Sequence, residues 1–350
     1  MAEGWFLLVH AVSPAGGRHK PLHLAGAVLA VATTVALLLV QRRRCRDTRR
    51  VALWAWCPAV PFAAVNDAHV DTRVLLTVAA LGTAAEAGRG ALLGAAIAVK
   101  LLPVLTLPGA LSGVPAPGVT PRARLRETAS VLLTAVGVVA LTYLPCLPAS
   151  GSAVLGHLPG YLREEGDESG SVDRFALLRL VLPDAWAGPA AVALAALSAW
   201  YVLRRGDPER PWDGSLLVTG TALLLTSPGY YWYALLVVAL VAMSGRWEWL
   251  AVAAAGTVLY VSDAPQWRQG VQASAYGLAA ATVLAGVLVR ARRVAAETRG
   301  GRVREGRRVG HMGREASSVA ASEDDHPQDA EAHHGHQGEA RREHQGLRCW

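Results

Sequence analysis

Lysine is nearly absent from this 350-residue chain, in which only Lys20 and Lys100 occur. Charged residues make up 17% of the sequence and hydrophobic residues 52%, which excludes an ordinary soluble protein and is typical of a membrane protein. The four cysteines lack the spacing of a metal site, and no glycine-rich phosphate loop, serine elbow or zinc-binding helix occurs. We therefore expect neither a soluble nucleotide-dependent enzyme nor a nucleic-acid partner.

Apolar runs recur along the chain instead. Ten of them cover residues 22–40, 51–65, 72–87, 91–111, 128–148, 188–203, 215–227, 231–243, 247–261 and 271–289. Several are shorter than the roughly 20 residues that a straight helix needs to cross a bilayer, so some are expected to be half-membrane helices enclosed by protein. The pattern predicts an all-α, polytopic integral membrane protein with about 9–11 transmembrane or half-membrane helices.

Arginine is concentrated in four loops, at residues 41–50, 121–126, 204–210 and 290–293. Because positive loops tend to stay on the cytoplasmic side, we place all four there. This threading requires residues 91–111 to cross the membrane an even number of times, as a proline-broken pair of half-helices that goes out and returns would do. It also places the loop 151–186 and the turns at 66–71 and 228–231 on the outer face.

The end of the chain has a different composition. Residues 290–350 are rich in Arg, Glu, Asp, Gly, Ser and His and contain almost no large apolar residue, which predicts a disordered cytoplasmic tail. Scarce lysine beside abundant alanine and arginine suggests a bacterial genome of high GC content. We therefore expect a multi-pass protein of the bacterial plasma membrane, in contact with membrane lipids.

Lys100 lies at the centre of the apolar run 91–111 and is followed by Pro103 and Pro108. A charge at bilayer depth usually faces a bundle interior or a water-filled cavity, and the prolines break the helix beside it. An ammonium in such a place suits a phosphate group. The alternatives are snorkelling toward the interface and pairing with a buried acid such as Glu86.

The outer turn at 66–71 contains Asp67, His69 and Asp71. Carboxylates at a membrane edge can remove the proton of a sugar hydroxyl or hold a divalent cation, and the histidine can share the proton. The alternative is a helix cap, since Asn or Asp before Thr72 would satisfy the free N–H groups of the next helix.

Two further outer segments carry candidate binding residues. Arg163 and Arg174 in the loop 151–186 are candidates for binding a lipid phosphate or an acidic sugar, with pairing to neighbouring carboxylates as the alternative. Tyr230, Tyr231 and Trp232 follow a Pro-Gly break and are candidates for contact with a sugar or a lipid chain. An aromatic belt at the membrane interface would explain the same aromatic residues without a ligand.

These segments resemble glycosyltransferase family 87, the bacterial polyprenyl-phosphate-sugar-dependent mannosyltransferases of the GT-C superfamily. The resemblance rests on NDAHVD at 66–71, GALLGAAIAVKLLPVLTLP at 90–108, GYLREEGDESGSVDRFALLRLVLPDAW at 160–186 and TSPGYYWYALLVVALVA at 226–242. It implies a GT-C-like bundle that transfers a hexose, with mannose expected, from a polyprenyl-phosphate donor to an envelope glycan or glycolipid on the outer face, with inversion. Asp67, His69, Asp71, Lys100 and Tyr230 match the polar turn, the intramembrane lysine and the later aromatic turn.

GT-C enzymes usually carry their catalytic acid in a first large outer loop that follows a first helix. The resemblance implies that this chain lacks both, so that residues 1–21 are a remnant of the outer segment and residues 22–289 form the transmembrane domain. Asp71 or Asp67 would then be the available carboxylate, with no cofactor certain and a divalent cation left open. Two other functions stay open: a transporter or flippase-like carrier of lipid-linked sugars, and an inactive structural partner of a complete transferase.

Overall fold

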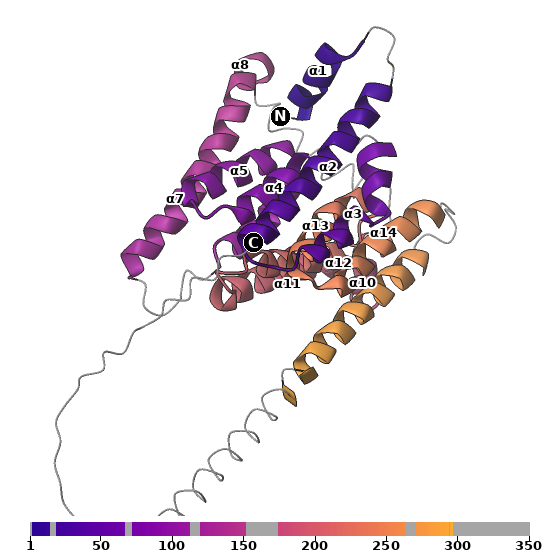
Figure 1. Cartoon of the computed structure of the whole chain (residues 1–350). Coiled ribbons are helices and arrows are strands. Elements are labelled where there is room, and N and C mark those ends of the chain that lie inside the picture. Colours follow the sequence, from indigo (N-terminus) through magenta and orange to yellow (C-terminus); the bar gives the residue numbers. More distant parts are fainter. Residues whose placement is uncertain are drawn as a thin grey trace, which may run out of the picture. The chain divides into compact units, whose positions relative to one another are not determined.

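The computed structural model describes residues 2–14, 19–66, 72–112, 120–151, 174–262, 270–293 and 295–296. Within these ranges every regular element is a helix (Figure 1), which confirms the predicted all-α class. The chain divides into two compact units, Met1–Val283 and Leu284–Trp350. The residues of the site described below belong to the first unit.

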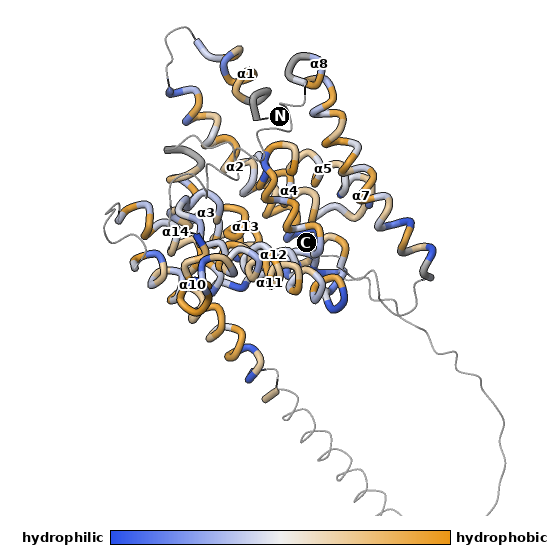
Figure 2. The backbone as a smooth tube through the Cα atoms, turned by 180° about the vertical axis from the view of Figure 1, so that it is seen from behind, coloured by the Kyte–Doolittle hydropathy of each residue, from blue (hydrophilic) through white to orange (hydrophobic). Residues whose placement is uncertain are grey.

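Within the described ranges, four helices are long and apolar enough to cross a membrane. They include α2 (Lys20–Arg43), α7 (Pro121–Tyr143), α11 (Asp184–Arg205) and the helix Gly270–Arg293. At most 28% of the apolar stretch of each is buried in the protein, so these helices present wide hydrophobic faces to lipid. Figure 2 shows hydrophobic residues along α2 and α7.

Shorter elements follow the remaining apolar runs. They are α1 (Ala2–Val12), η1 (Thr48–Val51), α3 (Ala52–Ala55), η2 (Pro61–Asn66), α4 (Thr72–Gly82), α5 (Glu86–Val99), η3 (Leu102–Thr106), α6 (Leu107–Ala110), η4 (Leu144–Cys146), α8 (Leu147–Ser150), α10 (Ala176–Arg179), α12 (Pro211–Thr226), η5 (Tyr231–Ala234), α13 (Leu235–Ser244), η6 (Trp247–Trp249) and α14 (Leu250–Ser262). The breaks between them occur at proline, glycine and polar residues, as expected for half-membrane helices.

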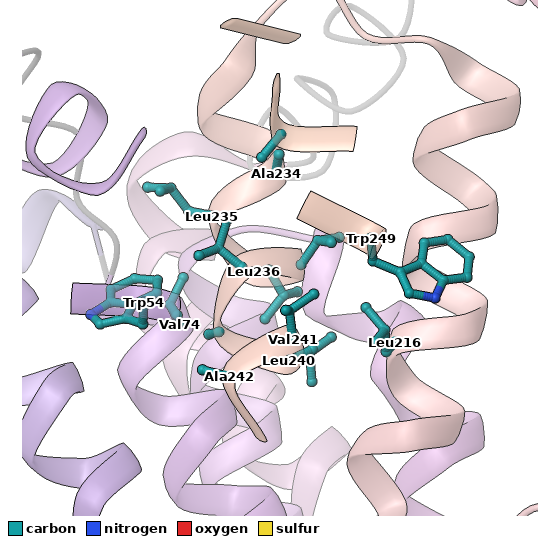
Figure 3. Packing of buried hydrophobic residues seen from close by; sticks show 14 of the residues in the cluster. Trp54, Val74, Leu216, Ala234, Leu235, Leu236, Leu240, Val241, Ala242 and Trp249 are labelled. Atoms are coloured by element: carbon teal, nitrogen blue, oxygen red, sulfur yellow. The ribbon is translucent and has the colours of Figure 1, made fainter. Parts of the chain in front are cut away.

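The helix α13 forms the centre of the core. All nine residues from Leu235 to Met243 are buried, so no side of this helix faces lipid. Figure 3 shows its side chains enclosed by residues from other elements, among them Trp54, Leu216 and Trp249. A helix that is apolar on every side and buried on every side is what the unbroken run of hydrophobic residues predicts.

The helices α4 and α5 pack as an antiparallel pair joined by the short link at 83–85. Arg89, near the start of α5, closes the pair: its guanidinium donates to the carbonyl oxygen of Thr83 at 3.1 and 3.3 Å and to that of Ala110 at 3.1 Å. The end of α6 therefore returns to the start of α5. This return confirms the predicted out-and-back path of residues 91–111, with Lys100 at the far end.

Small residues let α5 approach α7 closely. A methyl group added at Gly90 or Gly94 would collide with the backbone of α7 at Val131 or Ala135. These two glycines stand four residues apart and so lie on one face of α5, as in close helix pairs of membrane proteins.

Arginines from separate loops gather at one end of the first unit, which we call the basic end. It comprises Arg44, Arg46, Arg50, Arg210 and Arg246. Arg44 lies 3.7 Å from Glu209, and Arg50 donates a hydrogen bond of 3.2 Å to the carbonyl oxygen of Ser244. Arg46, Arg210 and Arg246 interact electrostatically with Asp213. Asp213 precedes the apolar run that begins at residue 215, and burial raises the pKa of its carboxyl while the nearby arginines lower it. Two of the loops predicted to share a side, 41–50 and 204–210, thus meet in space.

Candidate functional site

A turn between α12 and α13 carries the aromatic residues predicted to bind substrate. We call residues 226–233 the aromatic turn. The helix α12 ends at Thr226, and Ser227 adopts a left-handed conformation with φ 45° that redirects the chain. Tyr230 then stacks on Trp232 with ring centroids 4.4 Å apart and an angle of 16° between the rings. With 46% of its surface exposed, Tyr230 leaves an aromatic surface open to a ligand.

Tyr231 has a different role from its neighbours. Only 1% of its surface is exposed, and its ring packs against Phe62 of η2 at 6.1 Å and Tyr260 of α14 at 4.7 Å. Gly256 of α14 lies so close that an added methyl group would stand 3.0 Å from the Cα atom of Tyr231. Of the three aromatic residues predicted to touch a sugar or lipid, Tyr231 therefore supports the turn from within the protein.

Arg73 ties the start of α4 to the aromatic turn. Its side chain is fully buried, and its Nη2 atom donates a hydrogen bond of 2.9 Å to the carbonyl oxygen of Trp232. The sequence shows Arg73 only as a charge at the start of an apolar run. The structure makes it a contact between segments 159 residues apart in the chain.

Two more buried side chains bind the same turn from the helix Gly270–Arg293. The Nε2 atom of Gln272 donates to the Ser227 carbonyl at 2.5 Å, and the hydroxyl of Tyr276 donates to the Pro228 carbonyl at 2.8 Å. Sequence analysis did not identify either residue. The available signal was Gln272 itself, a polar residue at the start of the apolar run 271–289. A buried amide in such a run needs a hydrogen-bond partner.

The predicted catalytic residues Asp67, His69 and Asp71 lie outside the described residues. Their flanking segments are described, and both reach the aromatic turn: Phe62 of η2 through the ring of Tyr231, and Arg73 of α4 through the carbonyl of Trp232. The described residues on both sides of the predicted catalytic segment therefore contact the aromatic turn.

Lys100 stands at the end of α5. Its backbone is extended, with φ −153° and ψ 147°, so the helix stops where the lysine begins, and its side chain is half-buried. Because α4 and α5 are antiparallel, Lys100 lies at the same end of the pair as Arg73. Glu86 is at the opposite end of α5, about 20 Å away at 1.5 Å per residue, so an ion pair between Glu86 and Lys100 is excluded.

Phe175, after the part of the loop 151–186 that the structure does not describe, also contacts this end. The backbone N–H of Phe175 donates to the carbonyl oxygen of Thr226 at 3.2 Å, which places the adjacent Arg174 next to the aromatic turn. Arg174 is half-buried. Arg163, the other arginine predicted to bind phosphate, lies outside the described residues.

We call the region of Arg73, Lys100, Arg174 and the aromatic turn the site end. It has cations from three separate segments and a stacked ring pair of which Tyr230 is exposed. Cations of this kind bind phosphate or another anion, and aromatic rings bind apolar or ring-shaped groups. Among the residues that the structure describes, no group of three or more His, Cys, Asp or Glu side chains is placed to hold a metal ion.

Comparison with known proteins identifies the family. The model of glycosyltransferase family 87 matches residues 11–228, more than half of the chain, including Arg73, Lys100, Arg174 and the start of the aromatic turn. Searches among curated proteins and among solved structures found no significant match. With its apolar helices and this match, the chain belongs to glycosyltransferase family 87 and is a multi-pass membrane glycosyltransferase.

Proposed function

We propose that the protein transfers a hexose, mannose being the expected sugar, from a polyprenyl-phosphate donor to an envelope glycan or glycolipid on the extracytoplasmic face of the bacterial plasma membrane. The proposal is supported by the placement of Lys100, Arg174 and the Tyr230–Trp232 pair toward the same end of the helices. A lipid-linked sugar phosphate needs a cation for its phosphate and a surface for its sugar or chain, and both are present there.

The arginine-rich loops lie at the other end of the helices from the site end, which supports the assignment of the site to the outer face. The basic end gathers loops that the distribution of positive charge assigns to the cytoplasm, and the C-terminal tail is assigned to the same side. Helices that run from the basic end, such as α5 and α12, end at Lys100 and at the aromatic turn. The site end then faces away from the cytoplasm, where a donor that needs no soluble nucleotide is available.

In the proposed reaction, an acceptor hydroxyl oxygen attacks the anomeric carbon as the bond from that carbon to the phosphate oxygen breaks, which inverts the anomeric centre. A carboxylate, proposed to be Asp71 or Asp67 with His69 assisting, takes the hydroxyl proton. The polyprenyl phosphate leaves with its additional negative charge, which Lys100 stabilises with the help of Arg174 and Arg163. This scheme uses only residues of the chain, and a divalent cation remains an alternative partner for the phosphate.

The test is transfer by purified protein in lipid nanodiscs, supplied with labelled polyprenyl-phosphomannose and a mannoside glycolipid. We expect Lys100→Met to lower kcat by about 100-fold, as loss of one charge-stabilising group does in other enzymes, and Lys100→Arg to keep part of the activity. Lys20→Met is the matched control, because it removes the chain's other lysine at the exposed start of α2 and should leave the rate unchanged.

Three results would contradict the proposal. One is unchanged turnover and donor affinity in Lys100→Met. Another is movement of the labelled lipid between leaflets without any new glycosidic bond, which would identify a carrier. The third is transfer restored only by adding a second family member, which would identify a structural partner.

A further inference from the structure

The aromatic turn is held by hydrogen bonds from three side chains that lie outside it. A helix end leaves backbone carbonyls without helical partners, and a buried carbonyl needs a donor from elsewhere. The carbonyls of Ser227, Pro228 and Trp232 accept from Gln272 at 2.5 Å, Tyr276 at 2.8 Å and Arg73 at 2.9 Å, respectively. Two of these bonds precede Tyr230 in the chain and one follows it.

The three donors are among the most buried polar groups of the protein. The exposed fractions are 0% for Arg73, 1% for Gln272 and 1% for Tyr276. Gln272 and Tyr276 stand four residues apart and therefore on the same face of their helix, while Arg73 reaches the turn from α4. Hydrogen bonds shielded from water are stronger than exposed ones, and losing a donor leaves a buried carbonyl unsatisfied.

The part of the turn between these bonds is the part that is open. Tyr230 is about half exposed and stacks nearly parallel on Trp232, so Trp232 supports one face of the exposed ring. An unsupported turn with a Pro-Gly break would sample many conformations, and ordering it on binding would lower affinity. Fixing the backbone on both sides of Tyr230 removes that cost before the ligand arrives.

We propose that Arg73, Gln272 and Tyr276 are positioning residues that hold the Tyr230–Trp232 pair as a preformed stacking surface for the sugar ring of the donor. The inference rests on the proposed function for the identity of the donor. The face of a pyranose that carries C–H bonds packs on an aromatic ring, and the phenol and indole groups at the edges can bond to its hydroxyls. Loss of a positioning residue should therefore weaken donor binding more than it slows the chemical step.

Tyr276→Phe is the lead variant, because it removes one hydroxyl and keeps the ring. In nanodiscs we expect the Kd for labelled polyprenyl-phosphomannose to rise about three- to tenfold with kcat within twofold, as the loss of one hydrogen bond predicts. The Kd for polyprenyl phosphate without sugar should not change. Tyr201→Phe, at an exposed tyrosine of α11, is the control and should alter neither constant.

A second pair of variants separates positioning from stability. Gln272→Met and Gln41→Met each remove a buried amide that donates to a carbonyl, the latter at 2.8 Å to Ala242 at the basic end. Both should lower the melting temperature by similar amounts, and only Gln272→Met should raise the donor Kd. In a Tyr230→Ala background, Tyr276→Phe should have no further effect on donor Kd.

The inference is overturned if Tyr276→Phe and Gln272→Met leave the donor Kd unchanged. It is also overturned if both variants weaken the binding of polyprenyl phosphate as much as the binding of the sugar-bearing donor, which would assign the surface to the lipid chain. Because Kd is measured without turnover, failure of the wild-type protein to form a glycosidic bond would count against the proposed function alone.

Discussion

The two ends of the helical unit use arginine in opposite ways. At the basic end, Arg44 and Arg46 are half-buried and lie over the ring of Trp212 at 5.9 and 5.1 Å, and Arg44 makes a long contact of 3.7 Å with the exposed Glu209. At the site end, Arg73 is fully buried and directs a short hydrogen bond at one carbonyl. The basic end thus shares its charge among several partly exposed arginines, whereas Arg73 holds one backbone position through a buried hydrogen bond.

This difference has a consequence for substitution. Charge at the basic end is shared among several arginines, so that one can be lost without changing the sign of the surface. At the site end, Arg73, Gln272 and Tyr276 each donate to a different carbonyl of the turn, so that each lost donor affects its own bond. We expect variants at the basic end to lower stability or have no effect, with substrate binding unchanged. Variants at the site end should weaken substrate binding.

The largest effect on stability is expected from Trp212→Ala at the basic end. Trp212 is 1% exposed and lies beneath two guanidinium groups, so truncation leaves a cavity and removes their aromatic partner. Large-to-small changes of this kind cost about 3–5 kcal/mol. Thermal unfolding in nanodiscs should show a clear loss, while the donor Kd of the remaining folded protein stays at the wild-type value. A raised donor Kd would show that the two ends are coupled.

A pair of glycine-to-alanine changes should give an intermediate effect and compare the ends directly. Gly245 has φ +78° and would bring a methyl group within 2.9 Å of the Arg50 guanidinium, whereas Gly256 would bring one within 3.0 Å of the Tyr231 backbone. We expect Gly245→Ala to destabilise by about 1–2 kcal/mol through backbone strain without altering binding. Gly256→Ala should shift the aromatic turn and raise donor Kd. Equal changes in melting temperature and in donor Kd for the two variants would contradict the proposed difference between the two ends.

The smallest effect is expected from the Arg44–Glu209 pair. Glu209 is largely exposed and the contact is long, so a double-mutant cycle of Arg44→Gln and Glu209→Gln should give a coupling below about 1 kcal/mol. Melting temperatures of the wild-type protein, both single variants and the double variant, at low and high salt, provide the measurement. A coupling of several kcal/mol would show that the basic end is as specifically paired as the site end.

Much of the fold could be predicted from the sequence, because hydrophobic runs and their breaks are local properties. The runs at 22–40, 188–203 and 271–289 coincide with long helices, and the helix stops at Lys100 as the lysine and the prolines indicate. The run at 72–87 proved to be two elements, since α4 ends at Gly82 and α5 begins at Glu86.

The candidate site was predictable only in part. Tyr230, Trp232, Lys100 and Arg174 are conspicuous in the sequence as polar or aromatic residues at breaks. The contribution of Arg73 depends on a partner 159 residues away, and no local pattern reveals which carbonyl a buried donor will meet. The same limit explains why Tyr231 could not be told from its neighbours, since its burial is imposed by η2 and α14.

The enclosed helix α13 bears on how the protein responds to its membrane. At ten residues it is about 15 Å long, half the thickness of the hydrocarbon layer, and none of its surface touches lipid. Thickening or thinning of the bilayer therefore acts on peripheral helices such as α2, α7 and α11, which can tilt to match it. The packing around α13 is therefore shielded from that adjustment, whereas the aromatic turn is also bonded to the lipid-facing helix Gly270–Arg293.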